Sequence, residues 1–162
     1  MPGGFEFDDP TGREAPMPWR WSIDLAAGTV TDEQTDDRGG EFPRVNDALA
    51  TRPTRYHYNC LARTWEFEFE FHGVVKYDTH ADTAQEYFYA DSEVSGEHVF
   101  VADPAGSAED DGWLMSMVTD RVTDTSHLAI LDAHDVSAGP VARILIPRRV
   151  PLGFHANWYA GT

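Results

Sequence analysis

The chain has very little cysteine and very little lysine. Among its 162 residues there is one cysteine, Cys60, and one lysine, Lys76. A lone cysteine cannot close an internal disulfide and cannot build a thiolate metal cluster. The 28 acidic side chains outnumber the 12 basic ones, and the net charge of −16 repels phosphate backbones. We therefore expect no nucleic acid among the partners of this protein.

Long apolar runs are also missing. The longest are short segments such as Leu-Ala-Ile-Leu at 128–131 and Ile-Leu-Ile at 144–146, which cannot span a bilayer. The first ten residues contain acidic side chains, whereas a secretion signal begins with basic residues followed by an apolar stretch. Hydrophobic residues still make up 41% of the chain, as is typical of a globular protein. Together these features predict a soluble protein of the cytoplasm.

Helical periodicity is absent over any stretch of ten or more residues. Runs such as TWEFEFEF (64–71) instead alternate apolar and charged residues, which is the two-residue period of a β-strand. The segment DALATRP (47–53) is the nearest approach to a helical turn, and Pro53 ends it. The sequence therefore predicts a nearly all-β fold.

Three segments repeat one β-hairpin pattern. Residues 19–30, 73–89 and 128–146 each contain an apolar strand, an aspartate that leads a turn, and a second strand. The turn aspartates stand at positions 24, 78 and 132, each 54 residues from the next. A period near 50 residues with several strands in each unit is typical of β-propeller blades.

A polar residue follows each hairpin after a glycine, either directly or with one phenylalanine between them. These residues are Glu41, Glu97 and His155. If the units are successive blades, the three residues occupy similar positions near the start of an innermost strand and converge on the propeller axis. A metal-bound imidazole, with nearby carboxylates that accept from imidazole N–H groups, is a common arrangement around a metal. The alternatives are a buried core histidine and two ordinary acids at strand edges.

Four segments resemble the C-terminal part of the carotenoid cleavage oxygenases, a family that includes the stilbene-cleaving dioxygenases and the retinoid isomerase of the eye. They are EFPRVND (41–47), GEHVFVADP (96–104), EDDGWLMSMV (109–118) and the block at 127–158 that ends in GFHANW. The resemblance runs from about Trp19 to Trp158. It implies a seven-bladed β-propeller, of which residues 19–162 form roughly the last three blades after a leading loop at 1–18.

The resemblance also implies a chemistry. Members of the family hold a non-haem Fe(II) with four histidines and use O2 to cleave a conjugated carbon–carbon double bond into two carbonyl products. His155 matches the last iron ligand, and Glu41 and Glu97 match two glutamates that hold the imidazoles in place. The implied substrate is an apolar conjugated molecule, namely a carotenoid, an apocarotenoid or a stilbene. Because family members draw such substrates from membranes, peripheral membrane contact stays open.

The segments that carry the other three ligands in the family have no counterpart in this sequence. We therefore expect the isolated chain to be inactive and to need a missing N-terminal portion of the same enzyme. The alternative is a truncated, catalytically inactive propeller fragment with a binding or structural role. The run EDDG (109–112) is expected to be a solvated turn without chemistry. The remaining histidines are expected to be structural or exposed: His57, His72, His80, His98, His127 and His134.

Overall fold

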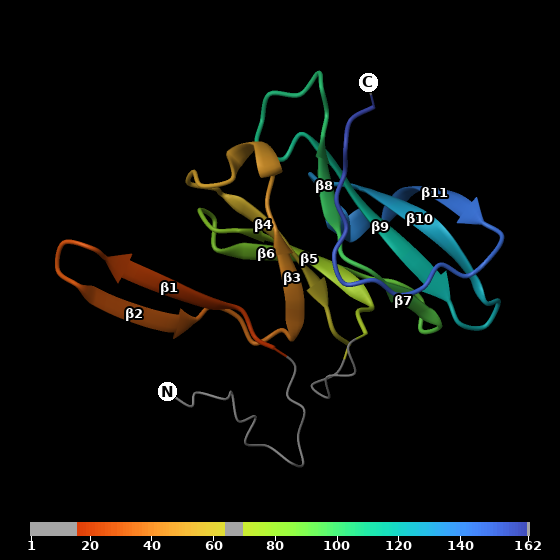
Figure 1. Cartoon of the computed structure of the whole chain (residues 1–162), viewed down its shortest axis with the longest axis horizontal. Helices are drawn as coiled ribbons and strands as arrows, with labels where there is room; N and C mark the ends of the chain where they lie inside the picture. The colour runs from red at the N-terminus through yellow and green to blue at the C-terminus, as the bar shows by residue number, and fades with distance from the viewer. Residues whose placement is uncertain (1–15, 64–69, 162) are drawn as a thin grey trace, which may run out of the picture.

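The computed structural model describes residues 16–63 and 70–161, and these residues form β-sheets almost throughout (Figure 1). These described residues form three antiparallel sheets of two, four and five strands. Most of the alternating run at 64–71 lies outside the described residues, as do residues 1–15 of the leading segment. The first strand begins at Trp19, and residues 16–18 have no regular secondary structure.

The first sheet is a hairpin of β1 (Trp19–Asp24) and β2 (Thr29–Gln34), which extends away from the rest of the molecule (Figure 1). The Oδ1 atom of Asp24 accepts the N–H groups of Ala26 and Ala27, both at 2.9 Å, as a turn-leading aspartate should. The predicted hairpin at 19–30 is confirmed.

The second sheet has the strand order β3-β4-β5-β6. Its strands are β3 (Gly40–Arg44), β4 (Tyr56–Leu61), β5 (Gly73–Asp78) and β6 (Thr83–Phe88). Asp78 accepts the N–H groups of His80 and Ala81 in the turn between β5 and β6, so the second predicted hairpin is confirmed. A short 3-10 helix, η1 (Asp47–Leu49), lies where the sequence indicated a helical turn.

The third sheet has an interrupted inner strand. Its strands are β7 (Glu93–Ser95), β8 (Val99–Ala102), β9 (Gly112–Asp120), β10 (Thr125–Asp132) and β11 (Pro140–Ile146). Both β7 and β8 pair with β9, because the chain leaves the ladder between them. The hairpin of β10 and β11 confirms the third predicted one, and a 3-10 helix, η2 (Val136–Ala138), connects its strands.

The hydrophobic core lies between the second and third sheets. The rings of Tyr58 on β4 and Phe100 on β8 stack across it, with centroids 5.8 Å apart. Alternate residues of the strands point into this layer, which is the usual reason that two sheets stay face to face. The buried cluster comprises Tyr58, Val74, Tyr89, Phe100, Leu114, Val118, Ala129, Leu131, Ala133 and Val136.

The run at 109–112 joins the same two sheets, so its prediction as a solvated turn is wrong. Asp110 is only 7% exposed and accepts a hydrogen bond from Nζ of Lys76 on β5 at 2.6 Å. Glu109 accepts the backbone N–H groups of Arg55 at 2.7 Å and Tyr56 at 2.8 Å. Sequence periodicity missed this role because the partners lie more than 30 residues away.

Candidate metal centre

The three residues singled out from the sequence come from three different parts of the fold. Glu41 is the second residue of β3, and Glu97 lies in the connection between β7 and β8. His155 lies in the segment 147–161, which forms no strand, so the prediction of a strand start at His155 is wrong. Pro147 and Pro151 lack the N–H groups that a sheet ladder needs at those positions.

All three nevertheless line one pocket of about 470 Å³. The pocket lies where β3 of the second sheet approaches the interrupted inner strand of the third sheet and the C-terminal segment. Its lining mixes carboxylates with aromatic rings and comprises Glu41, Phe42, Pro43, Arg44, Phe71, Glu97, Phe154 and His155.

Glu97 owes its position to the break between β7 and β8. The preceding Gly96 donates its N–H to the carbonyl of Met117 at 2.8 Å, and its own carbonyl accepts from Oγ of Ser116 at 3.0 Å. The thiol of Cys60 reaches the same carbonyl at 3.5 Å. These contacts hold the turn rigidly, and they leave the Glu97 side chain 3% exposed. A buried carboxylate needs hydrogen-bond partners at both oxygens.

The C-terminal segment supplies partners for both oxygens of Glu97. Nδ1 of His155 lies 3.5 Å from Oε1, and the backbone N–H of Ala156 donates to Oε2 at 2.6 Å. Because Nδ1 faces the carboxylate, Nε2 is the ring nitrogen left for a metal. The His155 side chain is 68% exposed, so its free face is open in this chain.

Glu41 shares the pocket but does not touch the imidazole. Its Oε2 lies 3.3 Å from the backbone N–H of Phe42, and its strand register pairs it with Cys60 on β4. No hydrogen bond joins Glu41 to His155 among the described residues. The structure thus brings His155 and Glu97 into contact and places Glu41 beside them.

Sequence reasoning missed Arg44 in this pocket, and it did not predict the packing of Phe42 against His155. The ring of Phe42 packs edge-on against the His155 ring, with centroids 5.0 Å apart. Nη1 of Arg44 lies 3.5 Å from Oε1 of Glu97, and Nη2 lies 3.2 Å from Oδ1 of Asn157. Both residues belong to the segment EFPRVND, which also carries Glu41.

A buried polar cluster lies directly behind Glu97. His98 places Nδ1 3.4 Å from Sγ of Cys60 and Nε2 3.0 Å from the hydroxyl of Tyr89. Burial lowers the pKa of His98 to about 3 and raises the pKa of Cys60 to about 12. Both groups are therefore neutral near pH 7, and the cluster packs the turn as the sequence predicted for His98.

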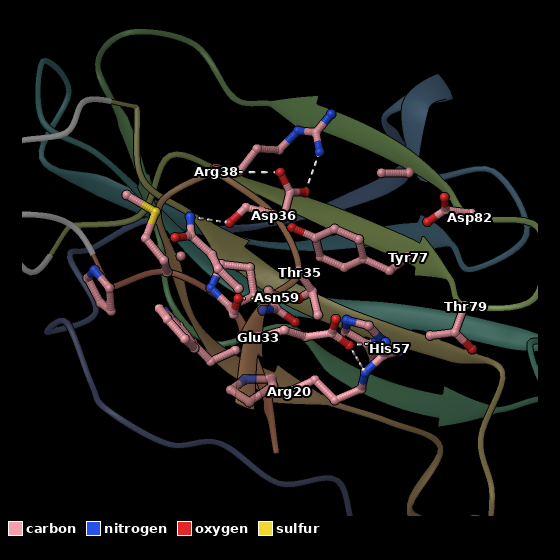
Figure 2. A pocket seen from close by; sticks show the side chains of 18 of the residues that line it. Arg20, Glu33, Thr35, Asp36, Arg38, His57, Asn59, Tyr77, Thr79 and Asp82 are labelled. Atoms are coloured by element: carbon pink, nitrogen blue, oxygen red, sulfur yellow. Dashed lines mark hydrogen bonds and ion pairs between the residues drawn. The ribbon is translucent and has the colours of Figure 1, made fainter. Parts of the chain in front are cut away.

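A larger pocket, of about 890 Å³, lies between the β1–β2 hairpin and the second sheet (Figure 2). Its charged side chains largely pair with one another: Arg20 with Glu33, and Arg38 with Asp36. His57 stacks on Tyr77 with ring centroids 4.6 Å apart. Neither His155 nor Glu97 lines this pocket. The smaller pocket is therefore the candidate metal centre.

The residues of the smaller pocket could supply one histidine ligand of a metal site, together with the carboxylate that orients it. His155 offers an imidazole whose second nitrogen faces a buried carboxylate, which is the usual surrounding of a metal-ligating histidine. Within residues 16–63 and 70–161, no three or more histidine, cysteine, aspartate or glutamate side chains are grouped so that they could hold a metal ion. Over the same residues, no helix has the length and apolar character needed to cross a membrane.

Comparison with known proteins adds a second line of observation. The profile of the family described as retinal pigment epithelial membrane protein (RPE65) matches residues 3–160. A carotenoid cleavage oxygenase of Mycobacterium tuberculosis is 37% identical over 158 residues, covering 92% of this chain and 30% of its own. Apocarotenoid-15,15′-oxygenase of Synechocystis is 34% identical over 140 residues, covering 86% of this chain and 29% of its own.

More distant relatives include lignostilbene-α,β-dioxygenase isozyme III of Sphingomonas paucimobilis, which is 29% identical over 96% of this chain and 34% of its own. Among solved structures, cobalt-substituted Synechocystis apocarotenoid oxygenase superposes with a TM-score of 0.85 at 33% identity, over 91% of this chain and 31% of that one. The predicted all-β fold, a part of a β-propeller, is therefore confirmed.

The chain spans about 30% of the length of the first two relatives. Its match to the family profile nevertheless covers almost its whole length. The resemblance predicted from the four segments is therefore confirmed, and the chain belongs to the retinal pigment epithelial membrane protein family, together with the carotenoid cleavage oxygenases.

Proposed function

We propose that this chain is the C-terminal part of a non-haem Fe(II) dioxygenase that cleaves a conjugated double bond with O2. The observation that carries the proposal is the double contact of Glu97 with the ring nitrogen of His155 and the N–H of Ala156. The names of the relatives support it, because they are oxygenases or dioxygenases of carotenoids, apocarotenoids and lignostilbenes. The substrate class we propose is accordingly an apolar conjugated molecule.

In this proposal His155 binds the iron through Nε2. Glu97 fixes the ring tautomer by accepting from Nδ1–H, and Glu41 serves another imidazole of the complete centre. The chemistry that Fe(II) supplies when bound is the activation of O2. Phe154, which lines the pocket, is 64% exposed, and Trp158 is 53% exposed; we assign both to the apolar wall that a polyene needs.

One imidazole cannot hold Fe(II) tightly, so we expect the isolated chain to bind iron well below one ion per chain. Metal analysis of the purified chain after incubation with Fe(II) and desalting measures this directly. One tightly held iron per chain would contradict the ligand set proposed here.

The activity is tested in a chimera, because a complete centre needs further ligands. Residues 19–161 replace the matching third of the Mycobacterium tuberculosis oxygenase, and products from an apocarotenoid substrate are counted under O2. We expect iron binding and two carbonyl products. His155→Ala should abolish both, whereas His80→Ala, at an exposed turn residue, should leave both unchanged. Glu97→Gln should weaken iron binding roughly 10–100-fold. An active His155→Ala chimera would refute the role of His155.

A catalytically inactive fragment with a binding or structural role is the second candidate. It is favoured by the lack, among the described residues, of a group of side chains that could hold a metal. The DNA upstream of the first codon discriminates the two. An in-frame extension with three further histidines in propeller-like repeats favours the oxygenase, and an early stop favours the fragment. The cytoplasmic location also stays a prediction, which cell fractionation tests.

A further inference from the structure

Strand β3 contains a β-bulge directly after Glu41. The register pairs Glu41 with Cys60 and Arg44 with Tyr58, so Phe42 and Pro43 together oppose the single residue Asn59. Bulges of this kind re-aim side chains and are frequent next to active sites. Here the two bulged residues, Phe42 and Pro43, both line the pocket that holds His155.

The backbone at Phe42 is strained. Its φ of +56° lies in the left-handed region, which is unfavourable for a bulky side chain. The conformation places the Phe42 ring among three others: Phe71 at 5.1 Å, Phe154 at 6.0 Å and His155 at 5.0 Å between centroids. The ring therefore supports the His155 imidazole from one side.

Arg44 acts from the other end of the bulge. Its guanidinium reaches Oε1 of Glu97 with Nη1, and Oδ1 of Asn157 and Oδ2 of Asp47 with Nη2. The Arg44 side chain is only 16% exposed, and its Nε is buried without a partner among the described residues. The planar guanidinium of Arg44 thus links the carboxylate of Glu97 to the side chain of Asn157, two positions after His155.

Two unfavourable features therefore occur within three residues: the left-handed backbone of Phe42, and the buried Nε of Arg44, which has no hydrogen-bond partner among the described residues. Such features persist only where the surrounding structure fixes them, and they concentrate at functional sites. We propose that Phe42 and Arg44 are positioning residues: Phe42 holds the ring of His155, and Arg44 holds the side chain of Asn157 and, through Glu97, the backbone of Ala156. This inference rests on the proposed function only where it treats His155 as a metal ligand.

The test uses the full chain, isotope-labelled and free of metal, and NMR reports two quantities. The first is the hydrogen-exchange rate of the Ala156 amide. The second is the displacement of the His155 ring-proton shifts caused by the neighbouring Phe42 ring. For Arg44→Met we expect exchange at Ala156 to be roughly tenfold faster, since the Glu97 acceptor loses its charged partner. The His155 shifts should move toward those of the exposed His80.

Matched variants separate positioning from general destabilisation. Arg20→Met removes an arginine from an exposed ion pair on β1 and should change neither readout. Arg44→Lys keeps a charge near Glu97 but cannot span both partners, so we expect protection at Ala156 to return while the Asn157 side-chain amide stays altered. Phe42→Leu should remove the shift displacement at His155. Phe42→Gly should also remove the shift displacement at His155, and it should relieve the backbone strain because glycine tolerates a positive φ.

Wild-type exchange at Ala156 and wild-type His155 shifts in Arg44→Met would overturn the proposal, provided that thermal unfolding shows the variant folded. Unchanged His155 shifts in Phe42→Leu would overturn it equally. Neither readout involves iron or substrate. The positioning role can therefore fail while the chimera is active, and it can hold while the chimera is inactive.

Discussion

The ion pair between Lys76 and Asp110 gives the sharpest prediction for stability. The only lysine of the chain is 4% exposed, and its Nζ donates to Asp110 at 2.6 Å and to the carbonyl of His134 at 3.3 Å. The ammonium also lies 4.2 Å from the centroid of the Tyr56 ring. The pair joins β5 of the second sheet to the connection before β9 of the third.

Replacing Lys76 by methionine keeps the volume and leaves the Asp110 carboxylate buried without its partner. Breaking a buried pair from one side costs about 3–5 kcal/mol of the free energy of unfolding. For a chain of this length that corresponds to a fall in melting temperature of roughly 10 °C. The exposed pair of Arg20 and Glu33 provides the contrast, because Arg20→Met should cost less than about 1 kcal/mol.

Urea denaturation followed by circular dichroism measures these changes, and a double-mutant cycle isolates the pair. We expect Lys76→Met and Asp110→Leu each to be strongly destabilising. The double variant should lie close to the wild type, because an apolar replacement of a buried pair is often neutral. If the two single effects simply add in the double variant, the two groups do not interact and the reasoning is wrong.

Three further predictions concern the surroundings of the candidate metal centre. Gly40→Ala should lower the free energy of unfolding, measured in urea, by about 1–3 kcal/mol, because a Cβ there would lie 2.4 Å from the carbonyl oxygen of Cys60. Gly153→Ala meets open space and should leave this free energy unchanged. Equal effects of the two substitutions would contradict the prediction. Burial raises the pKa of the Cys60 thiol to about 12. At pH 8 this thiol should therefore react with a thiol reagent at least ~100-fold faster in the urea-unfolded chain than in the native chain. Rapid labelling of the native chain would show that Cys60 is not buried. The pKa of His98 is about 3 in the folded chain and about 6.5 in the unfolded chain. Between these two pH values the unfolded chain binds more protons than the folded chain. The free energy of unfolding therefore falls as the pH drops from 6.5 toward 3. His98→Gln should reduce that slope by up to about 1.4 kcal/mol per pH unit, and an unchanged slope in titrated urea melts would refute the assignment.

The hairpins and the all-β fold could be predicted because their signals are local. An aspartate that leads a turn and a two-residue alternation act within a few positions, and the side chains of Asp24, Asp78 and Asp132 each accept the N–H of the residue two positions on. His155 and Glu97 do lie together as predicted, but not at equivalent strand positions, because Glu97 lies between β7 and β8 and His155 lies outside any strand.

The remaining site features depend on long-range contacts that no local pattern encodes. The role of Arg44 requires Asn157, which lies 113 positions further along the chain. The bulge that turns Phe42 toward His155 appears only once β3 pairs with β4. The run at 109–112 was predicted as solvated because its acids are locally unremarkable, and only the packing of the two sheets buries Asp110 against Lys76.

The absence of a strand in residues 147–161 has a consequence for the stability of the segment that carries His155. Glu41 lies in a sheet strand and Glu97 in a turn that is hydrogen-bonded to β9, whereas the segment that carries His155 is attached by single hydrogen bonds, among them those of Val150, Ala156 and Asn157. Breaking these bonds requires far less free energy than opening a sheet. The proposed function therefore predicts that this segment opens before either sheet does, so that the proposed ligand His155 can move without global unfolding.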